Sequence, residues 1–402
     1  MMRCDGAACF RLPSVREDDS PESELIFLTR SETFTTEVIC GKSLFFTLLI
    51  SLWKGQAKEE KMLFVNLGIL LIGFVALING ADFFVDGSAA LAKSFGIPSV
   101  IVGLTIVALG TSAPELAVST SAALQGSNEI ALSNVVGSNI FNTLMVLGVC
   151  AIIHPVPVDK VILKRDFPFT IAGSLFLLLT SGFLALVGAN HALVTDEIRA
   201  FLTGTLPEGA MELNVGVVSR IVGIALIAIF AAYILYLIFA SKDNAAEEDA
   251  EEGTQSVGKS ILMIVFGLAL IVAGGQAVVN SAKFIAAAAG MSETLIGLTV
   301  IALGTSLPEL VTSIVAARKG ETGLAVGNVV GSNIFNMMFI LGISAMIHPV
   351  AVNMASMFDL MILIGISLLA FLFCANDGKI ERKEGLVMVA VYAADMAFAI
   401  LR

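Results

Sequence analysis

The hexapeptide Gly110-Thr111-Ser112-Ala113-Pro114-Glu115 occurs twice in this chain, the second time as Gly304-Thr305-Ser306-Leu307-Pro308-Glu309. The two copies belong to a longer internal repeat. Residues 103–156 align without a gap on residues 297–350, at a constant offset of 194, and 32 of the 54 aligned positions are identical. Chance does not produce such agreement, so we infer that one structural unit is present twice.

The composition places both copies in a lipid bilayer. Of 402 residues, 57% are hydrophobic and 14% are charged, and the mean hydropathy of +0.91 is far above what the core of a soluble domain requires. Apolar segments of about 20 residues, each long enough to cross roughly 30 Å of hydrocarbon as a helix, recur along most of the chain. Alternating ten-residue segments of a membrane barrel are absent from the sequence. Ten helical spans are predicted, at residues 63–92, 97–124, 129–153, 166–189, 217–240, 259–288, 292–317, 322–347, 356–375 and 384–401.

The spacing of the two copies predicts their topology. The offset contains five spans, and because five is an odd number the copies enter the bilayer from opposite faces. The predicted fold is an all-α integral membrane protein with ten transmembrane helices, arranged as two inverted-topology five-helix repeats. Four segments are predicted. Residues 1–61 form an N-terminal extension, and Met62, which follows it, is a possible true start of the chain. Residues 62–240 form the first repeat, residues 241–258 an acidic loop, and residues 259–402 the second repeat.

The basic residues predict an orientation. The loops after odd-numbered spans hold eleven Lys and Arg residues, whereas the opposite face of the core holds three. Cytoplasmic loops carry the excess of basic residues in membrane proteins. We therefore expect the acidic loop in the cytoplasm and the C-terminus outside. A ten-span core without a large cytoplasmic regulatory domain is typical of a bacterial inner membrane protein.

Each hexapeptide places a carboxylate inside an otherwise apolar span. A charged side chain at the centre of a bilayer costs about 3 kcal/mol on insertion scales. No Lys or Arg lies within one or two helical turns of Glu115 or Glu309 in these spans. The missing opposite charge predicts that a metal cation binds there.

The rest of the hexapeptide supplies oxygen ligands for such a cation. Pro114 and Pro308 lack an N–H group and clash with the carbonyl four residues earlier, which opens the helix near Gly110 and Gly304. Ca²⁺ prefers six to eight hard oxygens with one or two carboxylates, and Na⁺, of nearly equal radius, can use a subset of them. Zinc or copper would require His or Cys, which the hexapeptides lack. The predicted hydroxyl ligands are Thr111, Ser112, Thr305 and Ser306.

A second polar motif, Asn-Val-Val-Gly-Ser-Asn-Ile-Phe-Asn, follows in each copy, at residues 134–142 and 328–336. Within each motif a Ser and an Asn lie four residues apart on one helix face, so the pair can present two neutral oxygens to one point. For the serines, a hydrogen bond back to a helix carbonyl is the alternative. The predicted pairs are Ser138 with Asn142, and Ser332 with Asn336. Asn134 and Asn139 are interpreted as helix contacts, because amide side chains hold membrane helices together.

The paired motifs GTSAPE with NVVGSNIFN and GTSLPE with NVVGSNIFN resemble the two alpha repeats of the cation/calcium exchanger superfamily, and within it the prokaryotic sodium/calcium exchanger branch. The resemblance covers residues 62–402. It implies a secondary active antiporter that exchanges Ca²⁺ for Na⁺ by alternating access. The ions would be substrates, with no cofactor, no nucleic acid and no implied oligomer. Proton-coupled relatives usually carry Gly-Asn-Ala before the Glu, so Gly-Thr-Ser here favours Na⁺ coupling.

The resemblance also implies a diamond of four ion sites. Glu115 and Glu309 would bridge the ions, and the first and sixth helices would slide across the other eight. Some relatives have Asp at the position of Asn336. Because this chain has Asn at both 142 and 336, its site has a formal charge of −2 when both glutamates are ionised. That charge matches one Ca²⁺ or two Na⁺. The backbone carbonyls that would complete the shell are those of Ala108 and Ala302.

Three other functions are compatible with parts of the sequence. A carrier of the same fold could couple Ca²⁺ to H⁺ or K⁺, and a cation channel could use the same glutamates. Inverted repeats with helices broken at proline favour a carrier over a channel. An enzyme is not predicted, because no GxSxG, HExxH or Ser-His-Asp set is placed for chemistry.

Overall fold

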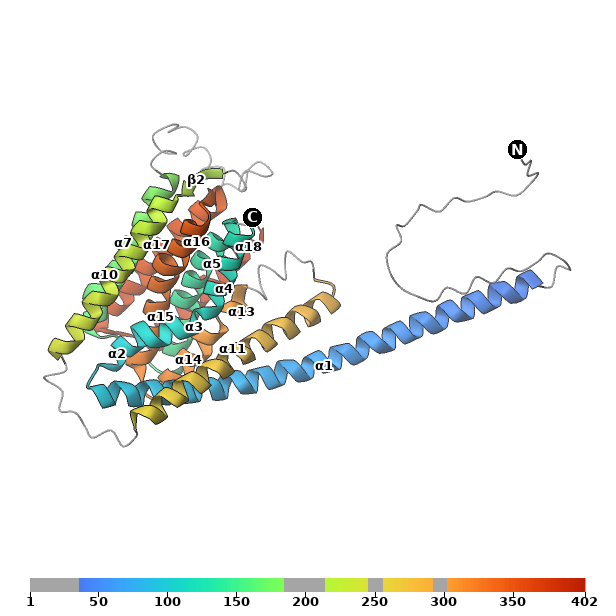
Figure 1. The fold of residues 1–402 in the computed structure, drawn as a ribbon, viewed down its shortest axis with the longest axis horizontal. Coiled ribbons are helices and arrows are strands. Elements are labelled where there is room, and N and C mark those ends of the chain that lie inside the picture. Colours follow the sequence, from blue (N-terminus) through green and yellow to red (C-terminus); the bar gives the residue numbers. More distant parts are fainter. Residues whose placement is uncertain (1–35, 127, 184–213, 245–255, 292–301, 402) are drawn as a thin grey trace. The chain divides into compact units, whose positions relative to one another are not determined.

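The computed structural model describes residues 36–126, 128–183, 214–244, 256–291 and 302–401 (Figure 1). Within these residues, six helices are long and apolar enough to cross a membrane, and a bent pair of helices forms a seventh such span. This is the architecture of a multi-pass membrane protein. The chain divides into two compact units, Met1–Glu59 and Glu60–Arg402, and the second contains both copies of the repeat.

The described elements follow the repeat closely. Before the acidic loop they are α1 (Thr36–Phe95), α2 (Ser99–Val102), η1 (Gly103–Val107), α3 (Ala108–Thr111), α4 (Ala113–Leu124), α5 (Asn128–Phe141), η2 (Asn142–Val146), α6 (Leu147–Ile153), β1 (Val156–Pro157), η3 (Ile162–Asp166), α7 (Phe167–Leu178), η4 (Leu179–Phe183), β2 (Asn214–Val218) and α10 (Arg220–Asn244). After the loop they are α11 (Val257–Ala288), α13 (Ala302–Thr305), α14 (Leu307–Arg318), α15 (Thr322–Ile334), η7 (Phe335–Ile340), α16 (Leu341–Ile347), β3 (Val350–Asn353), α17 (Met354–Asp377), β4 (Lys379–Ile380) and α18 (Arg382–Leu401). The η segments are π-helical turns.

The first predicted span is confirmed, since the apolar part of its helix runs over Lys61–Phe95. The helix itself begins earlier, at Thr36, because the charged segment before the span is rich in the helix formers Lys, Glu, Gln and Ala. The fifth span begins at Arg220, because the residues just before it form the strand β2. Spans 166–189 and 292–317 lie partly outside the described residues. Helix α18 is not among the six described helices that are long and apolar enough to cross a membrane. Ten spans therefore stay a prediction.

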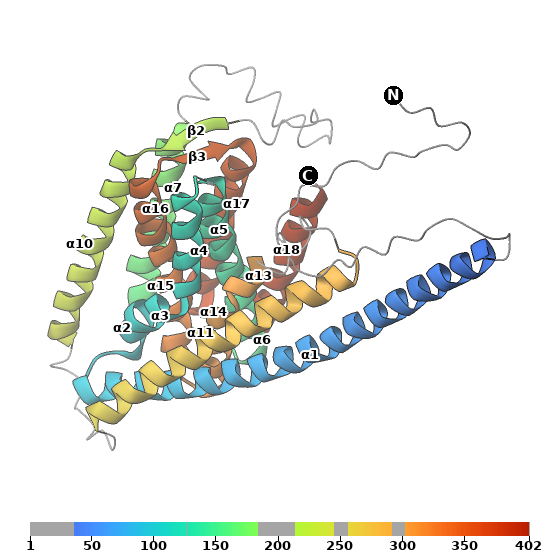
Figure 2. The same ribbon diagram turned by 45° about the vertical axis from the view of Figure 1, so that its right-hand side comes forward.

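Helices α1 and α11 lie side by side and pack through glycines (Figures 1 and 2). Gly73 and Gly80 on α1 face Gly274 and Gly267 on α11. A Cβ atom on Gly80 would lie 2.8 Å from the carbonyl oxygen of Gly267, and one on Gly274 would lie 2.7 Å from that of Gly73. No side chain fits at these positions, so the two backbones touch, as small residues allow in membrane helices.

Each hexapeptide breaks its helix at the serine. Ser112, with φ −83° and ψ 10°, separates α3 from α4, and Ser306, with φ −92° and ψ 8°, separates α13 from α14. Pro114 and Pro308 lie in the first turn of the following helices, where the missing N–H removes no intrahelical hydrogen bond. The first pair of helices bends by 49° at this break. The proline effect predicted from the sequence is thus confirmed, with the break at the serine.

Helix α15 packs closely against the broken span of the first copy. A Cβ atom on Gly103 would lie 3.0 Å from the Cα atom of Gly327, and one on Gly331 would lie 2.7 Å from the Cα atom of Leu104. This close approach of backbones brings the second motif of one copy next to the hexapeptide of the other. The candidate site lies at this crossing.

Two short antiparallel strand pairs join distant segments at the ends of the helices. Strand β1 pairs with β4, and Val156 lies opposite Ile380. Strand β2 pairs with β3, and Val218 lies opposite Val350. Val156 and Val350 are matching residues of the repeat, so each copy ends in a strand that pairs with a segment from the other half of the chain.

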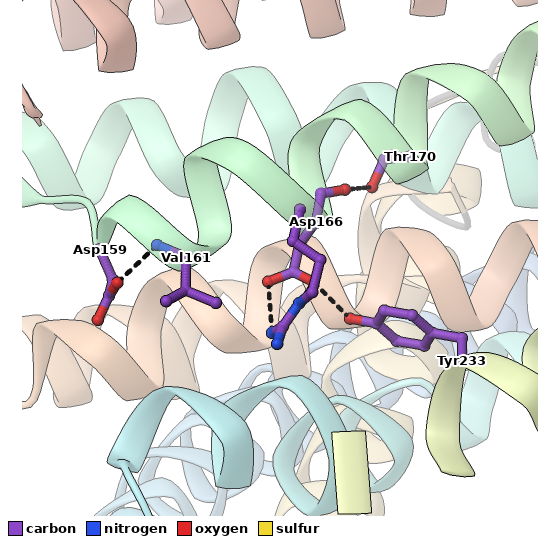
Figure 3. Close-up of polar contacts among 6 residues, drawn as sticks. Asp159, Val161, Asp166, Thr170 and Tyr233 are labelled. Carbon is purple, nitrogen blue, oxygen red and sulfur yellow. Dashed lines mark hydrogen bonds and ion pairs between the residues drawn. The ribbon is translucent and has the colours of Figure 1, made fainter. Parts of the chain in front are cut away.

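A buried carboxylate joins α7 to α10, as Figure 3 shows. Asp166 accepts hydrogen bonds from Nε of Arg165 at 2.6 Å and from the hydroxyl of Tyr233 at 3.0 Å, and its backbone carbonyl accepts one from Thr170 at 2.9 Å. A second bond to Arg165 measures 2.9 Å. A buried charge that has its own guanidinium partner needs no metal ion. We therefore interpret Asp166 as a structural link between helices.

Candidate cation site

The twelve residues predicted to hold a cation come from both copies of the repeat. In the structure their described side chains are buried at the crossing of the broken helices with α5, α15 and the π-helical turns η2 and η7. Turns of this kind are frequent at functional sites. The first copy contributes Ala108 and Thr111 (α3), Ser112, Glu115 (α4), Ser138 (α5) and Asn142 (η2), and the second contributes Ala302 and Thr305 (α13), Ser306, Glu309 (α14), Ser332 (α15) and Asn336 (η7).

The two glutamates are held by serines of the opposite copy. The Ser112 hydroxyl donates to Oε1 of Glu309 at 2.9 Å, and the Ser306 hydroxyl donates to Oε1 of Glu115 at 3.0 Å. Oγ of Ser306 also lies 3.1 Å from Oγ of Ser138. The hydrogen bonds therefore cross between the copies, and both carboxylates face one shared interface.

Among the residues that the structure describes, four oxygens at this interface have no hydrogen-bond partner. They are Oε2 of Glu115, Oε2 of Glu309, Oδ1 of Asn142 and Oδ1 of Asn336, and all four side chains are 0% exposed. An unpartnered polar atom in a buried position costs about 1–3 kcal/mol, and more if it is charged. Nδ2 of Asn142 is also without a partner in this part of the structure. The four oxygens are hard ligands of the kind that Ca²⁺ and Na⁺ take, so cations bound at this interface could compensate them.

The carboxylates also lack a basic partner. Among the described residues, the ion pairs join Arg165 to Asp166, Lys319 to Asp82 and Asp86, and Lys379 to Glu381, and none includes Glu115 or Glu309. Within the described part of the chain, no basic side chain compensates the charges of these two carboxylates. A cation is the species that fits them.

The backbone carbonyls named from the resemblance are only partly available. The Ala108 carbonyl accepts the N–H of Ser112 at 3.1 Å and lies 3.4 Å from the hydroxyl of Thr111. Because a carbonyl oxygen has two lone pairs, ligation at Ala108 would compete with the weaker of these contacts. Ala302 begins α13, and the residues before it lie outside the described chain.

Amide side chains behind the site join the two copies. Nδ2 of Asn139 donates to the carbonyl of Asn333 at 3.1 Å, and Nδ2 of Asn336 donates to Oδ1 of Asn139 at 3.2 Å. The helix contact predicted for Asn139 is confirmed. Because its nitrogen is engaged in this way, Asn336 presents its free oxygen in a fixed orientation.

Sequence reasoning missed one set of residues near the site. Nδ2 of Asn328 donates to Oγ of Ser313 at 2.9 Å, and Oδ1 of Asn328 accepts the Thr111 hydroxyl at 2.9 Å. In the other copy, Asn134 on α5 donates to Oγ of Ser119 on α4 at 2.9 Å, which confirms the helix contact predicted for Asn134. The sequence did contain a sign of this set, because serine occurs in both copies of the repeat four residues after the glutamate, at Ser119 and Ser313.

The first helix carries acidic groups that its repeat partner lacks. Nζ of Lys319, at the end of α14, lies 3.0 Å from Asp82 and 2.7 Å from Asp86 on α1. Partial burial lowers the pKa of the Lys319 ammonium, but the hydrogen bonds to both carboxylates outweigh burial and hold the pKa above its ordinary value. The matching positions in the repeat are the neutral residues Gln125, Gln276 and Asn280. The two acidic residues are about half exposed and pair with Lys319, so they are not part of the buried crossing that holds the glutamates.

Known proteins resemble this chain over almost its whole helical part. The model of the family "Sodium/calcium exchanger protein" matches residues 65–239 and 259–401. The sodium/calcium exchanger MaX1 of Methanosarcina acetivorans is 34% identical over 367 residues, covering 83% of this chain and 98% of that protein. The inner membrane protein YrbG of Escherichia coli is 32% identical over 316 residues, covering 76% and 87% respectively. A solved structure of the sodium-calcium exchanger NCX_Mj superposes with a TM-score of 0.66 at 29% identity, covering 83% of this chain and 98% of that one.

Proposed function

Since this chain belongs to the sodium/calcium exchanger protein family, we propose that it is a secondary active antiporter that exchanges Ca²⁺ for Na⁺ at the site between Glu115 and Glu309. The observation that carries the proposal is the set of four buried oxygens without partners, two of them on carboxylates that lack a basic neighbour. These four oxygens, two of them from carboxylates, would supply part of the six to eight hard oxygens that Ca²⁺ prefers, and Na⁺ could use a subset of them.

Exchange follows if the two ions use overlapping oxygens. Glu115 and Glu309 cannot be fully shared by a Ca²⁺ and two Na⁺ at the same time, so loading of one ion displaces the other. Each ion must stabilise the conformations that carry it across the membrane. A ligand that binds two conformations with equal affinity does not change the equilibrium between them. Competition at one site then couples the two fluxes.

Alternating access in this proposal uses the inverted repeats predicted from the sequence. Helices α1 and α11 would move together across the remaining helices, since their glycine contacts leave no space between the two backbones. The acidic loop would lie in the cytoplasm and the C-terminus outside, as the distribution of Lys and Arg predicts. A bacterial inner membrane is the proposed location.

Uptake of radiolabelled Ca²⁺ into proteoliposomes tests the proposed coupling. Vesicles loaded with Na⁺ and diluted into Na⁺-free buffer should accumulate Ca²⁺, whereas vesicles with equal Na⁺ on both sides should not. Accumulation driven by a pH gradient, or only in the presence of K⁺, would assign the protein to another coupling ion. Single-channel currents in a planar bilayer would identify a channel and overturn the proposal.

The charge of the site predicts electroneutral exchange. Glu115 and Glu309 carry two negative charges and the other predicted ligands are neutral, so we expect two Na⁺ to be exchanged for each Ca²⁺. A membrane potential of about 100 mV, set with K⁺ and valinomycin, should then leave the Ca²⁺ accumulation ratio unchanged. A three-for-one exchange would move one charge, worth about 2.3 kcal/mol or roughly 50-fold in that ratio.

The variant Asn336→Asp is the matched comparison for this prediction. It would change the formal charge of the site from −2 to −3. Three Na⁺ neutralise a charge of −3, whereas one Ca²⁺ does not. Its uptake should therefore depend on membrane potential. If the unmodified protein shows the same dependence as Asn336→Asp, the predicted stoichiometry is wrong.

A further inference from the structure

Asn328 links the hexapeptide of the first copy to that of the second without facing the ions itself. Its Nδ2 atom donates to Oγ of Ser313 at 2.9 Å and lies 3.4 Å from the backbone carbonyl of Glu309. Its Oδ1 atom accepts the hydroxyl proton of Thr111 at 2.9 Å. Asn328 is 1% exposed, so water does not compete for these bonds.

The two donor contacts determine which way the amide of Asn328 points. An amide group has two N–H donors on one side and a carbonyl acceptor on the other. Because both donors have acceptors on α14, at Ser313 and at Glu309, the oxygen must face Thr111. With the amide reversed, the Ser313 hydroxyl could still donate to the amide oxygen, but that oxygen would also face the backbone carbonyl of Glu309, which has no proton to donate.

The orientation of the Thr111 hydroxyl matters for binding a cation. A hydroxyl has one proton and two lone pairs, and only a lone pair can bind a cation. Two alternative acceptors for this proton are farther away: the Ala108 carbonyl at 3.4 Å and Oγ of Ser332 at 3.5 Å. The amide oxygen of Asn328 is therefore the nearest of these three acceptors for the Thr111 proton, and the lone pairs of the hydroxyl point away from Asn328.

We propose that Asn328 is a positioning residue for ion binding: by accepting the Thr111 proton, it turns the lone pairs of that hydroxyl toward the transported cation. The matching residue of the other copy, Asn134, repeats the two donor contacts: its Nδ2 atom donates to Oγ of Ser119 at 2.9 Å and to the carbonyl of Glu115 at 3.3 Å. This inference rests on the proposed cation site. It adds a group that acts through a ligand rather than as one.

Equilibrium binding of radiolabelled Ca²⁺ to the full chain in detergent tests the proposal with a double-mutant cycle. Asn328→Ala should weaken Ca²⁺ binding about tenfold, the usual effect of losing one such buried hydrogen bond. Thr111→Val removes the hydroxyl at nearly constant shape and should weaken binding at least as much. In the double variant, Asn328→Ala should add less than a twofold change, because the hydroxyl that it orients is gone.

The outcomes separate positioning from a structural role. Ser313→Ala, which removes an acceptor of the Asn328 amide, should weaken binding two- to threefold alone and not at all in the Asn328→Ala protein. If the effects of Asn328→Ala and Thr111→Val multiply to about a hundredfold, or if Asn328→Ala leaves the affinity unchanged, the positioning role is wrong while Ca²⁺ exchange stands. If the unmodified protein does not bind Ca²⁺, the proposed function itself fails.

Discussion

Glu115→Gln and Glu309→Gln are each expected to lower Na⁺-driven Ca²⁺ uptake at least about 100-fold. Each variant removes one of two negative charges from the buried site while keeping the shape of the side chain. A unit charge about 4 Å from an ion is worth roughly 4 kcal/mol per ion charge at an effective dielectric constant of 20. The measurement is the initial rate of uptake into Na⁺-loaded proteoliposomes, with the amount of reconstituted protein determined for each variant.

Asp166→Asn is the control for the glutamate variants, because Asp166 is also a buried carboxylate. Its charge is already paired with Arg165. We expect this variant to lower the thermal stability of the protein and to leave its Ca²⁺ affinity within about threefold of the original. Uptake above a tenth of the original rate in either glutamate variant would show that the cation site is elsewhere.

Gly80→Val is expected to destabilise the folded protein by about 3 kcal/mol, at the upper end of what overpacking costs. Its Cβ atom would lie 2.8 Å from the carbonyl oxygen of Gly267 and 2.8 Å from the backbone nitrogen of Ile271, and backbone atoms cannot rotate away as a side chain can. Helices α1 and α11 would have to separate. Thermal unfolding in detergent, followed by size-exclusion chromatography, measures the loss.

Gly68→Val is the matched control on the same helix. Apart from its chain neighbours and the backbone of its own helix turn, no atom of the described residues lies within 4 Å of a Cβ atom placed on Gly68, so the valine has space. Its stability should stay close to that of the original protein, because valine has a slightly better helix propensity than glycine. Equal melting temperatures for the Gly80 and Gly68 variants would mean that the glycine contact between α1 and α11 does not hold the two helices together.

Much of this protein is encoded in short-range patterns. The apolar segments indicate a membrane protein because their length is set by the thickness of the bilayer. Pro114 and Pro308 predict broken helices because a missing N–H is a local defect. Glu115 and Glu309 predict a cation because a lone carboxylate is unfavourable at that depth wherever the rest of the chain lies. The family was also recognisable from the two motifs and their spacing.

The pairing of those groups depends on contacts between residues far apart in the chain. Ser112 and Glu309 are 197 residues apart, and Thr111 and Asn328 are 217 apart. A repeated motif gives both copies the same local chemistry, so it cannot tell whether a serine binds the glutamate of its own copy or of the other. Helix α15 of the second copy crosses the broken helix of the first, because glycines at 103 and 327 let the two backbones approach. This crossing pairs the serine of each hexapeptide with the glutamate of the other copy. That close packing determines the site that these residues form.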